Sequence, residues 1–331
     1  MGVLMSNLAF IYKTLYEPHQ YTDFSSFHRF VELYRLKHPE NNSAFDMSVL
    51  TAYQNNPTFI EERFLKLILE LNNIPVDPKY LNLYIYRMNV ESFSSEENND
   101  DYGILVDELF TYTMRSFFFT VFSLANDDSC LNFERCFKNF IVTLDLQGRK
   151  KKIGTHDKMD FNEMMCMPLN VLNLACDAYW CALSFIIGHE LYHLTHKNDE
   201  HSLEDEINAD HFGYRILISM IEFQKDNRIP QELQVFSENQ YLSPIIFLEY
   251  FRLYEEFQML CNVNAQESSP FSPKLRENLI TEVYFDEIPE SFNTEEGNDL
   301  LNNILDAIEK LEKQLIIKLE NGKLDFIINK H

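Results

Sequence analysis

The chain is organised around a stretch that reads Gly188-His189-Glu190-Leu191-Tyr192-His193, followed by Glu206-Ile207-Asn208-Ala209-Asp210. An apolar run precedes the first part and favours a helix there. On a helix, residues four apart lie on nearly the same face, so His189 and His193 can present two imidazoles to one metal ion. Glu190 lies beside that face, where its carboxylate can reach a water on the metal and act as general base. The spacing therefore predicts a hydrolytic metal site.

Two histidines do not complete such a site. Zinc in a hydrolytic centre usually takes three protein ligands and leaves a fourth position for water. We expect Glu206 to be the third ligand, because Ser202 and Asp205 form a loose capping box that predicts a second helix starting there. If this helix returns antiparallel to the first, Asp210 is well spaced to accept a hydrogen bond from the outer nitrogen of a ligating histidine.

Glycine is rare in this chain, with eight residues in total. Gly188 lies next to the first histidine, and Gly213 follows Asp210 on the expected second helix. Two glycines on facing helices would allow a close approach of the two backbones.

The motif HExxH, followed at short distance by ExxAD and a glycine three residues later, resembles gluzincin metallopeptidases of the CAAX-prenyl-protease and HtpX type. It also resembles the soluble Lit-type phage-exclusion peptidases. The resemblance is confined to residues 178–215, and the chain lacks the membrane spans of the first group. It implies that His189, His193 and Glu206 bind zinc, that Glu190 is the catalytic base and that Asp210 supports a ligand. It also implies a narrowly specific intracellular protease, in phage defence or in toxin-like control of a host protein.

Two further questions stay open at this stage. The group that stabilises the transition state is not defined by the motif, and Tyr214 and His211 are the candidates. His196 continues the histidine stripe, but it lies about 10 Å along the axis from His189, which favours a helix-end role. The alternative function is a non-catalytic interaction module with a structural or vestigial zinc site. A closed shell of four ligands, completed by His196 or Asp210, would support that alternative.

The composition restricts the classes of partner that the chain can bind. Lysine and arginine number 28 against 52 acidic residues, which gives a net charge of -24 and argues against nucleic acid or anionic membranes as partners. This charge would attract a protein or peptide substrate of basic character. The alternative is that the charge only keeps the protein soluble. The six cysteines form no CxxC pair, so we expect reduced thiols and a cytoplasmic location. The apolar runs are too short to span a membrane, and no feature specifies the oligomeric state.

We expect a mainly α-helical α+β fold with a zincin-like catalytic core and a small antiparallel sheet. Residues 1–93 should form a helical N-terminal region, 94–225 the metallopeptidase core, and 226–331 a helical C-terminal region that can pack with the core as one domain. We expect the strand at 137–146 to hold the substrate backbone by β-augmentation. The pattern also predicts a strand at 81–90, and helices at 27–36, from 58 onward, 105–125, 171–197, 202–223, 244–261 and 299–320.

Overall fold

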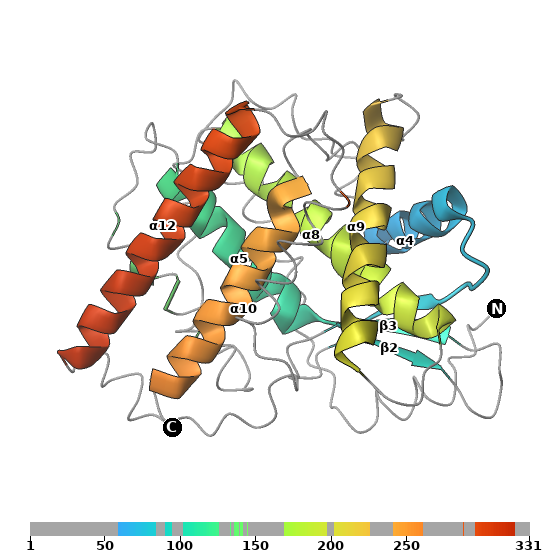
Figure 1. The fold of residues 1–331 in the computed structure, drawn as a ribbon, viewed down its shortest axis with the longest axis horizontal. Helices are drawn as coiled ribbons and strands as arrows, with labels where there is room; N and C mark the ends of the chain where they lie inside the picture. Colours follow the sequence, from blue (N-terminus) through green and yellow to red (C-terminus); the bar gives the residue numbers. More distant parts are fainter. Residues whose placement is uncertain are drawn as a thin grey trace. The chain divides into compact units, whose positions relative to one another are not determined.

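The structure is a computed structural model. It describes residues 59–83, 90–94, 102–125, 169–196, 202–225, 241–260 and 295–321, together with a few positions between 133 and 144 and residue 287. The helix expected at 27–36 and the first residue of the helix expected from 58 onward lie outside the described residues. The prediction of a mainly helical chain is confirmed (Figure 1). The helices are α4 (Phe59–Asn72), α5 (Glu108–Ala125), α8 (Leu169–Thr195), α9 (Leu203–Lys225), α10 (Ser243–Leu260) and α12 (Glu295–Glu320).

Three short strands form one described sheet. They are β1 (Lys79–Leu83), β2 (Val90–Ser94) and β3 (Tyr102–Asp107), in the order β1-β3-β2. β1 runs parallel to β3 and β2 runs antiparallel to it, so the sheet is mixed and not antiparallel as expected. Ile104 and Val106 alternate along the central strand and are both fully buried, as the two-residue period of a strand requires.

Two boundaries in the first half of the chain differ from the prediction. The strand expected at 81–90 begins at Lys79 and ends at Leu83, and Val90 starts the separate strand β2. The helix expected from residue 105 begins instead at Glu108, because residues 105–107 complete β3. A short apolar run suits either structure. Pairing with a strand on each side settles the choice here.

The strand expected at 137–146 is wrong at every described position of that segment. Phe137, Phe140, Ile141 and Leu144 are helical and buried. Phe140, Ile141 and Leu144 lie three, four and seven residues after Phe137, which places all four on one helical face and explains how a helix buries them together. This segment therefore cannot supply the substrate-binding strand.

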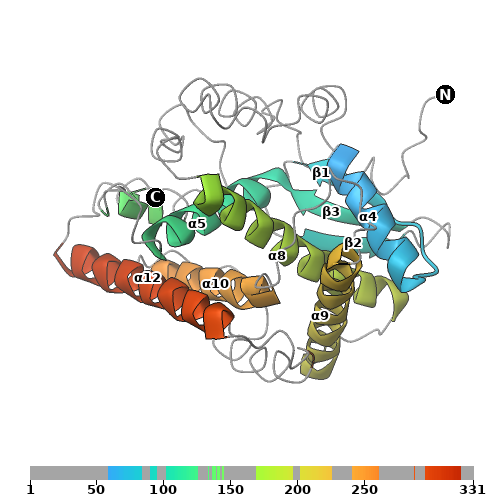
Figure 2. The ribbon, with the colours of Figure 1, turned by 90° about the horizontal axis from the view of Figure 1, so that it is seen from above.

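The chain divides into two compact units, each made of two separate segments. The first contains residues 1–112 and 183–234, and the second contains residues 113–182 and 235–331. These boundaries differ from the three consecutive regions expected from the sequence. The first unit holds the sheet, α4, α9 and the C-terminal part of α8. Within it, α9 crosses α8 at a steep angle close to β2 (Figures 1 and 2).

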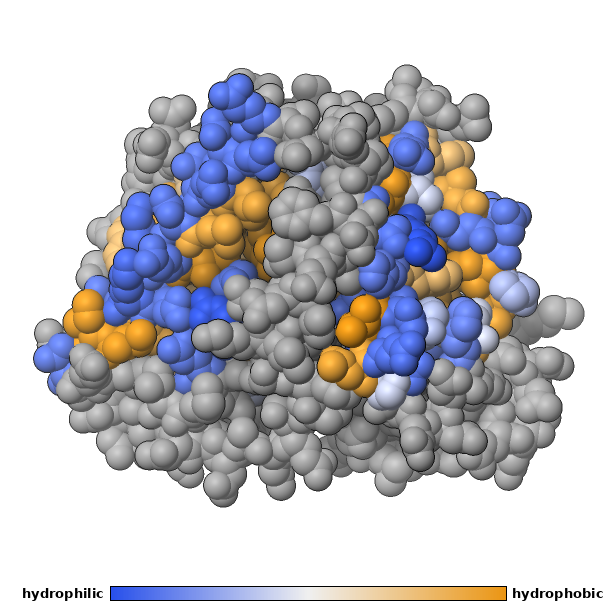
Figure 3. All heavy atoms as spheres, in the orientation of Figure 1, coloured by the Kyte–Doolittle hydropathy of each residue, from blue (hydrophilic) through white to orange (hydrophobic). Residues whose placement is uncertain are grey.

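The second unit is built around aromatic and aliphatic packing. Phe117 of α5 contacts Tyr250 of α10, with ring centroids 4.8 Å apart. α12 lies beside α10 and has a mostly hydrophilic outer surface, with Ile317 as an exposed apolar residue (Figures 1 and 3). The inner face of α12 repeats at three- and four-residue steps, as expected for an amphipathic helix. Its fully buried members are Ile304, Ala307, Ile308, Leu311 and Leu315. Among the described residues, no helix combines the length and apolar character needed to cross a membrane.

Candidate metal centre

A contact between two glycines sets the approach of α8 and α9. A Cβ atom built on Gly188 would lie 2.9 Å from the Cα of Gly213 and 2.9 Å from a side-chain carbon of Ile216. A Cβ atom on Gly213 would lie 2.6 Å from the carbonyl oxygen of Phe185. Real Cβ atoms do not approach so closely, so both positions require glycine. The predicted close approach is confirmed, but the helices cross steeply and do not lie antiparallel (Figures 1 and 2).

The first turn of α9 is held by the capping box that the sequence predicts. The Oγ of Ser202 accepts a hydrogen bond from the amide of Asp205 at 3.1 Å. In return, the amide of Ser202 donates to Oδ2 of Asp205 at 3.3 Å, and its hydroxyl donates to the same oxygen at 2.8 Å. The amide of Glu206 donates to the carbonyl of Ser202 at 3.2 Å. These bonds begin the helix and fix the turn that carries Glu206.

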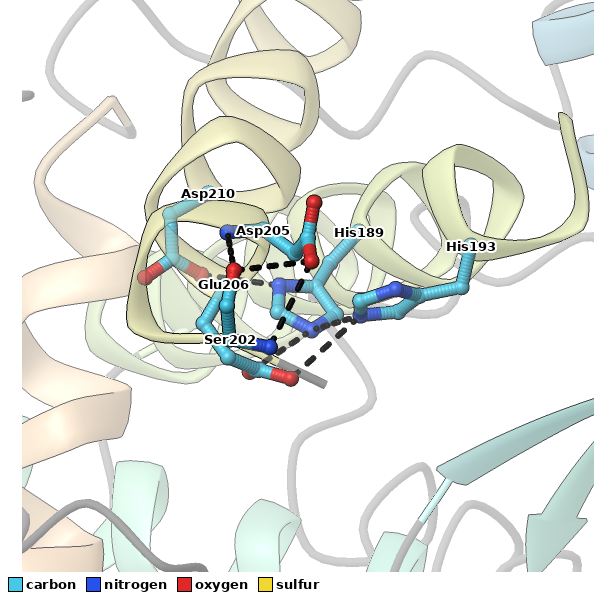
Figure 4. Close-up of polar contacts among 6 residues, drawn as sticks. All are labelled: His189, His193, Ser202, Asp205, Glu206 and Asp210. Atoms are coloured by element: carbon cyan, nitrogen blue, oxygen red, sulfur yellow. Dashed lines mark hydrogen bonds and ion pairs between the residues drawn. The ribbon is translucent and has the colours of Figure 1, made fainter. Parts of the chain in front are cut away.

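Three predicted ligands converge where the helices meet (Figure 4). The Nε2 atoms of His189 and His193 lie 3.1 Å apart. One carboxylate oxygen of Glu206 lies 3.5 Å from Nε2 of His189, and the other lies 3.6 Å from Nε2 of His193. The side chains of His189, His193 and Glu206 are 11%, 16% and 16% exposed, so the cluster is shielded but still open to water.

These three side chains are close enough together to hold one metal ion. For bonds of 2.0–2.1 Å to zinc, tetrahedral geometry separates neighbouring donor atoms by about 3.3 Å. The Nε2–Nε2 separation of 3.1 Å lies close to that value, and each Nε2 has a different oxygen of Glu206 at 3.5 or 3.6 Å. With one donor atom taken from each residue, all three atoms lie within 4.8 Å of one another. The two contacts of Glu206 are longer than ordinary N–H···O bonds, which span about 2.7–3.2 Å. The donor set of two imidazoles and one carboxylate is also one that zinc accepts.

Asp210 supports His189 from the outer side of the ring (Figure 4). Its Oδ1 lies 2.8 Å from Nδ1 of His189, and its side chain is 4% exposed. An N–H at Nδ1 that donates to Asp210 leaves the lone pair of Nε2 free for a metal. Burial lowers the pKa of His189, but the hydrogen bonds with Asp210 and Glu206 and the nearby charge of Glu190 outweigh it and raise the pKa to about 9. The surrounding carboxylates thus favour positive charge at this point.

Glu190 and His196 lie outside the three-residue cluster. Glu190 is half-buried and acts electrostatically on His189, as expected for a carboxylate beside the ligands. His196 is exposed, and its Nδ1 lies 2.9 Å from the hydroxyl of Thr195 and 3.2 Å from the carbonyl of Tyr192. Its ring also stacks on Tyr192 at 4.2 Å. His196 therefore caps the end of α8, which agrees with the helix-end interpretation.

The two candidates for transition-state stabilisation, Tyr214 and His211, lie outside the cluster of candidate ligands. Tyr214 is fully buried, and its ring meets Phe185 edge-on at 5.2 Å, so it packs between α8 and α9. His211 is half-buried and is not a member of the ligand cluster. Their catalytic role stays a prediction.

The contacts that hold His196 were not predicted from the sequence. Thr195 lies two residues after the motif, and a hydroxyl in the last turn of a helix commonly bonds to a carbonyl of the preceding turn. Here the hydroxyl of Thr195 donates to the carbonyl of Leu191 at 2.9 Å. A threonine in the last turn of the predicted helix was therefore the sequence signal for these contacts.

No protein-family model, curated protein or solved structure matches the chain. The functional assignment therefore depends on the residues of the site and their geometry.

Proposed function

We propose that the chain is a zinc-dependent metallopeptidase with a zincin-like core. The observation that carries this proposal is the convergence of His189, His193 and Glu206, whose donor atoms, one from each residue, lie within 4.8 Å of one another. Three protein ligands leave one position for substrate or water, which is the arrangement of catalytic zinc sites. The resemblance of HExxH and ExxAD to gluzincin peptidases supports the same assignment.

The alternative of a structural zinc site requires a fourth protein ligand. Among the described residues, the two candidates for that position bond elsewhere. Asp210 contacts the outer nitrogen of His189, and His196 bonds to the end of α8. The described geometry therefore favours a catalytic over a closed structural site.

The reaction would divide between the ion and the chain. A zinc ion held here would supply Lewis acidity toward a water molecule and toward the scissile carbonyl. Glu190 would accept the proton of that water as it attacks the carbonyl carbon, and would return the proton to the leaving amine nitrogen. Asp210 would keep His189 in its ligating tautomer. The low exposure of the cluster limits competing water and strengthens these electrostatic interactions.

The substrate backbone needs a partner near the ligands. Because the segment 137–146 is helical where described, we assign this role to β2. It is an edge strand of the described sheet and lies near the crossing of α8 and α9 (Figures 1 and 2). An edge strand offers unpaired backbone groups to an extended peptide. From the Lit-type resemblance, we further propose a narrow protein substrate range. Efficient cleavage of unfolded casein would count against it.

The test combines metal content with two substitutions. Mass spectrometry of the purified protein should find about one zinc per chain. Glu206→Ala should lose most of that zinc, whereas Glu190→Gln should keep it. New protein N-termini should appear when the wild type is added to a cell lysate and should be absent with Glu190→Gln. Full cleavage by Glu190→Gln would overturn the mechanism, and absence of zinc after reconstitution would overturn the metal site.

A further inference from the structure

The ligand Glu206 sits in the first turn of its helix, where helices fray most readily. Its own amide makes the first bond of the α-helical ladder, to the carbonyl of Ser202. His189 and His193, in contrast, lie well inside the ladder of α8, which continues to Thr195. The position of Glu206 therefore depends on how firmly the first turn of α9 is formed.

We infer that Ser202 and Asp205 are positioning residues that hold Glu206 in place for the metal. Figure 4 shows both side chains next to the ligand cluster. The hydroxyl of Ser202 accepts from the amide of Asp205 and donates to its carboxylate, so each residue satisfies a group of the other. Ser202 thus binds the turn twice, through its side chain to Asp205 and through its carbonyl to Glu206.

The residue types suit this role. Serine is among the best N-cap residues, since its short side chain reaches the amide three residues on. Asp205 has a shorter side chain than the glutamate usual at this place, yet it still reaches back to the amide of Ser202. Its negative charge near the helix N-terminus is also favourable. The cap is exposed at Ser202, so it is not needed to fill the core.

If the turn frays without its cap, zinc has to order it on binding, and the affinity falls. This inference rests on the metal-binding part of the proposed function and not on peptide hydrolysis. Ser202→Ala should weaken zinc binding by about 2- to 30-fold, the range that corresponds to loss of an N-cap. Ser202→Thr keeps the hydroxyl and should restore most of the affinity.

The measurement is zinc affinity of the full chain, by competition with a chromophoric chelator. A cobalt titration followed by visible absorption gives a second readout. Ser219→Ala is the matched control, because it removes a hydroxyl from the middle of the same helix, where it bonds to the carbonyl of Ile216. Asp205→Ala should weaken zinc binding more than Glu204→Ala, which removes an equal charge from an exposed neighbour. This second pair serves if Ser202→Ala does not fold.

The outcomes separate this inference from the proposed function. Wild-type affinity in Ser202→Ala, or equal losses in Ser202→Ala and Ser202→Thr, would overturn the positioning role alone. A wild type that binds no zinc would overturn both. A cap-dependent affinity combined with full proteolysis by Glu190→Gln would leave the positioning role standing and remove the peptidase mechanism.

Discussion

At the scale of single residues, Asp210 is the group in direct hydrogen-bonding contact with the candidate ligand His189. It contacts His189 at 2.8 Å from the side away from the cluster. We predict that Asp210→Asn weakens zinc binding by about 10- to 100-fold, because the ring loses its negatively charged acceptor. Chelator competition measures this loss. Asp306→Asn, an exposed change on α12, is the control and should leave the affinity unchanged. An unchanged affinity in Asp210→Asn would contradict the supporting role.

Asp177 of α8 gives a prediction about pH. Burial raises the pKa of this carboxyl to about 8, far above its ordinary value. Between about pH 4 and 8 the folded chain therefore holds a proton at Asp177 that the unfolded chain releases, so this group lowers stability as pH rises. Asp177→Asn should add little stability at pH 5 and about 1–3 kcal/mol at pH 8. Urea unfolding at the two pH values measures it, and an equal gain at both would contradict this assignment.

The residues of the candidate site were predictable because a metal-binding motif restricts residue types and their spacing strongly. The four-residue spacing of His189 and His193 places both on one face of a helix. The capping box of Ser202 and Asp205 predicts the start of α9. Glu206 and Asp210 follow from that start. The pattern could not give the angle between the two helices, because that angle depends on which side chains meet at the crossing. It also could not reveal the contacts by which His196 caps α8, because these depend on the positions of Thr195 and Tyr192.

At the scale of elements, the crossing of α8 and α9 is the feature most sensitive to a single added carbon. We predict that Gly213→Ala lowers both stability, by about 1–3 kcal/mol, and zinc affinity. The new Cβ would lie 2.6 Å from a backbone oxygen of Phe185, which cannot move without shifting α8. Asn208→Ala, on the exposed face of α9, should change neither quantity by much. Urea unfolding and zinc titration measure both, and wild-type affinity in Gly213→Ala would show that the helices can separate without disturbing the ligands.

The elements differ in how well the sequence determined them. α8 was expected at 171–197 and runs over Leu169–Thr195, since a long apolar segment with a polar end has few alternatives. The segment 137–146 has a short apolar run with β-branched residues, and local preference alone favoured a strand. Burial of Phe137, Phe140 and Leu144 on one helical face outweighs that preference. The strand β3 was missed because its short apolar run suits a helix or a strand, and pairing with β1 and β2 decides between them.

At the scale of the whole molecule, α10 and α12 are joined by a charged cluster in the second unit. Arg252 donates to both carboxylate oxygens of Glu312, at 2.7 and 3.0 Å, and to the buried Glu249 at 3.0 Å. Arg252→Met should lower stability by about 2–4 kcal/mol, because Glu249 then stays buried without the guanidinium. Differential scanning calorimetry measures the change. Lys313→Ala removes an exposed pair with Glu309 and should cost under about 1 kcal/mol.

The Arg252→Met variant also tests whether the two compact units are independent of each other. The three candidate ligands lie in the first unit, whereas Arg252 lies in the second. Zinc affinity should therefore be the same in Arg252→Met and in the wild type. A loss of zinc binding in Arg252→Met would show that the two units depend on each other.

The hydrogen bond from Arg252 holds the pKa of Glu312 below its ordinary value. The stability that this ion pair contributes is therefore present near neutral pH and is lost as the pH falls through the acid range.

The candidate ligands on α8 and α9 lie at unequal distances from the contact between Gly188 and Gly213. His189 follows Gly188 directly, whereas Glu206 precedes Gly213 by seven residues, which is about 10 Å along α9. A rotation of α9 by about 10° around the contact would leave His189 almost in place and carry Glu206 by about 2 Å. A displacement of about 1 Å can already cost a hundredfold in rate. Any partner that turned α9 slightly would thus open or close the candidate metal site while touching none of its three candidate ligands.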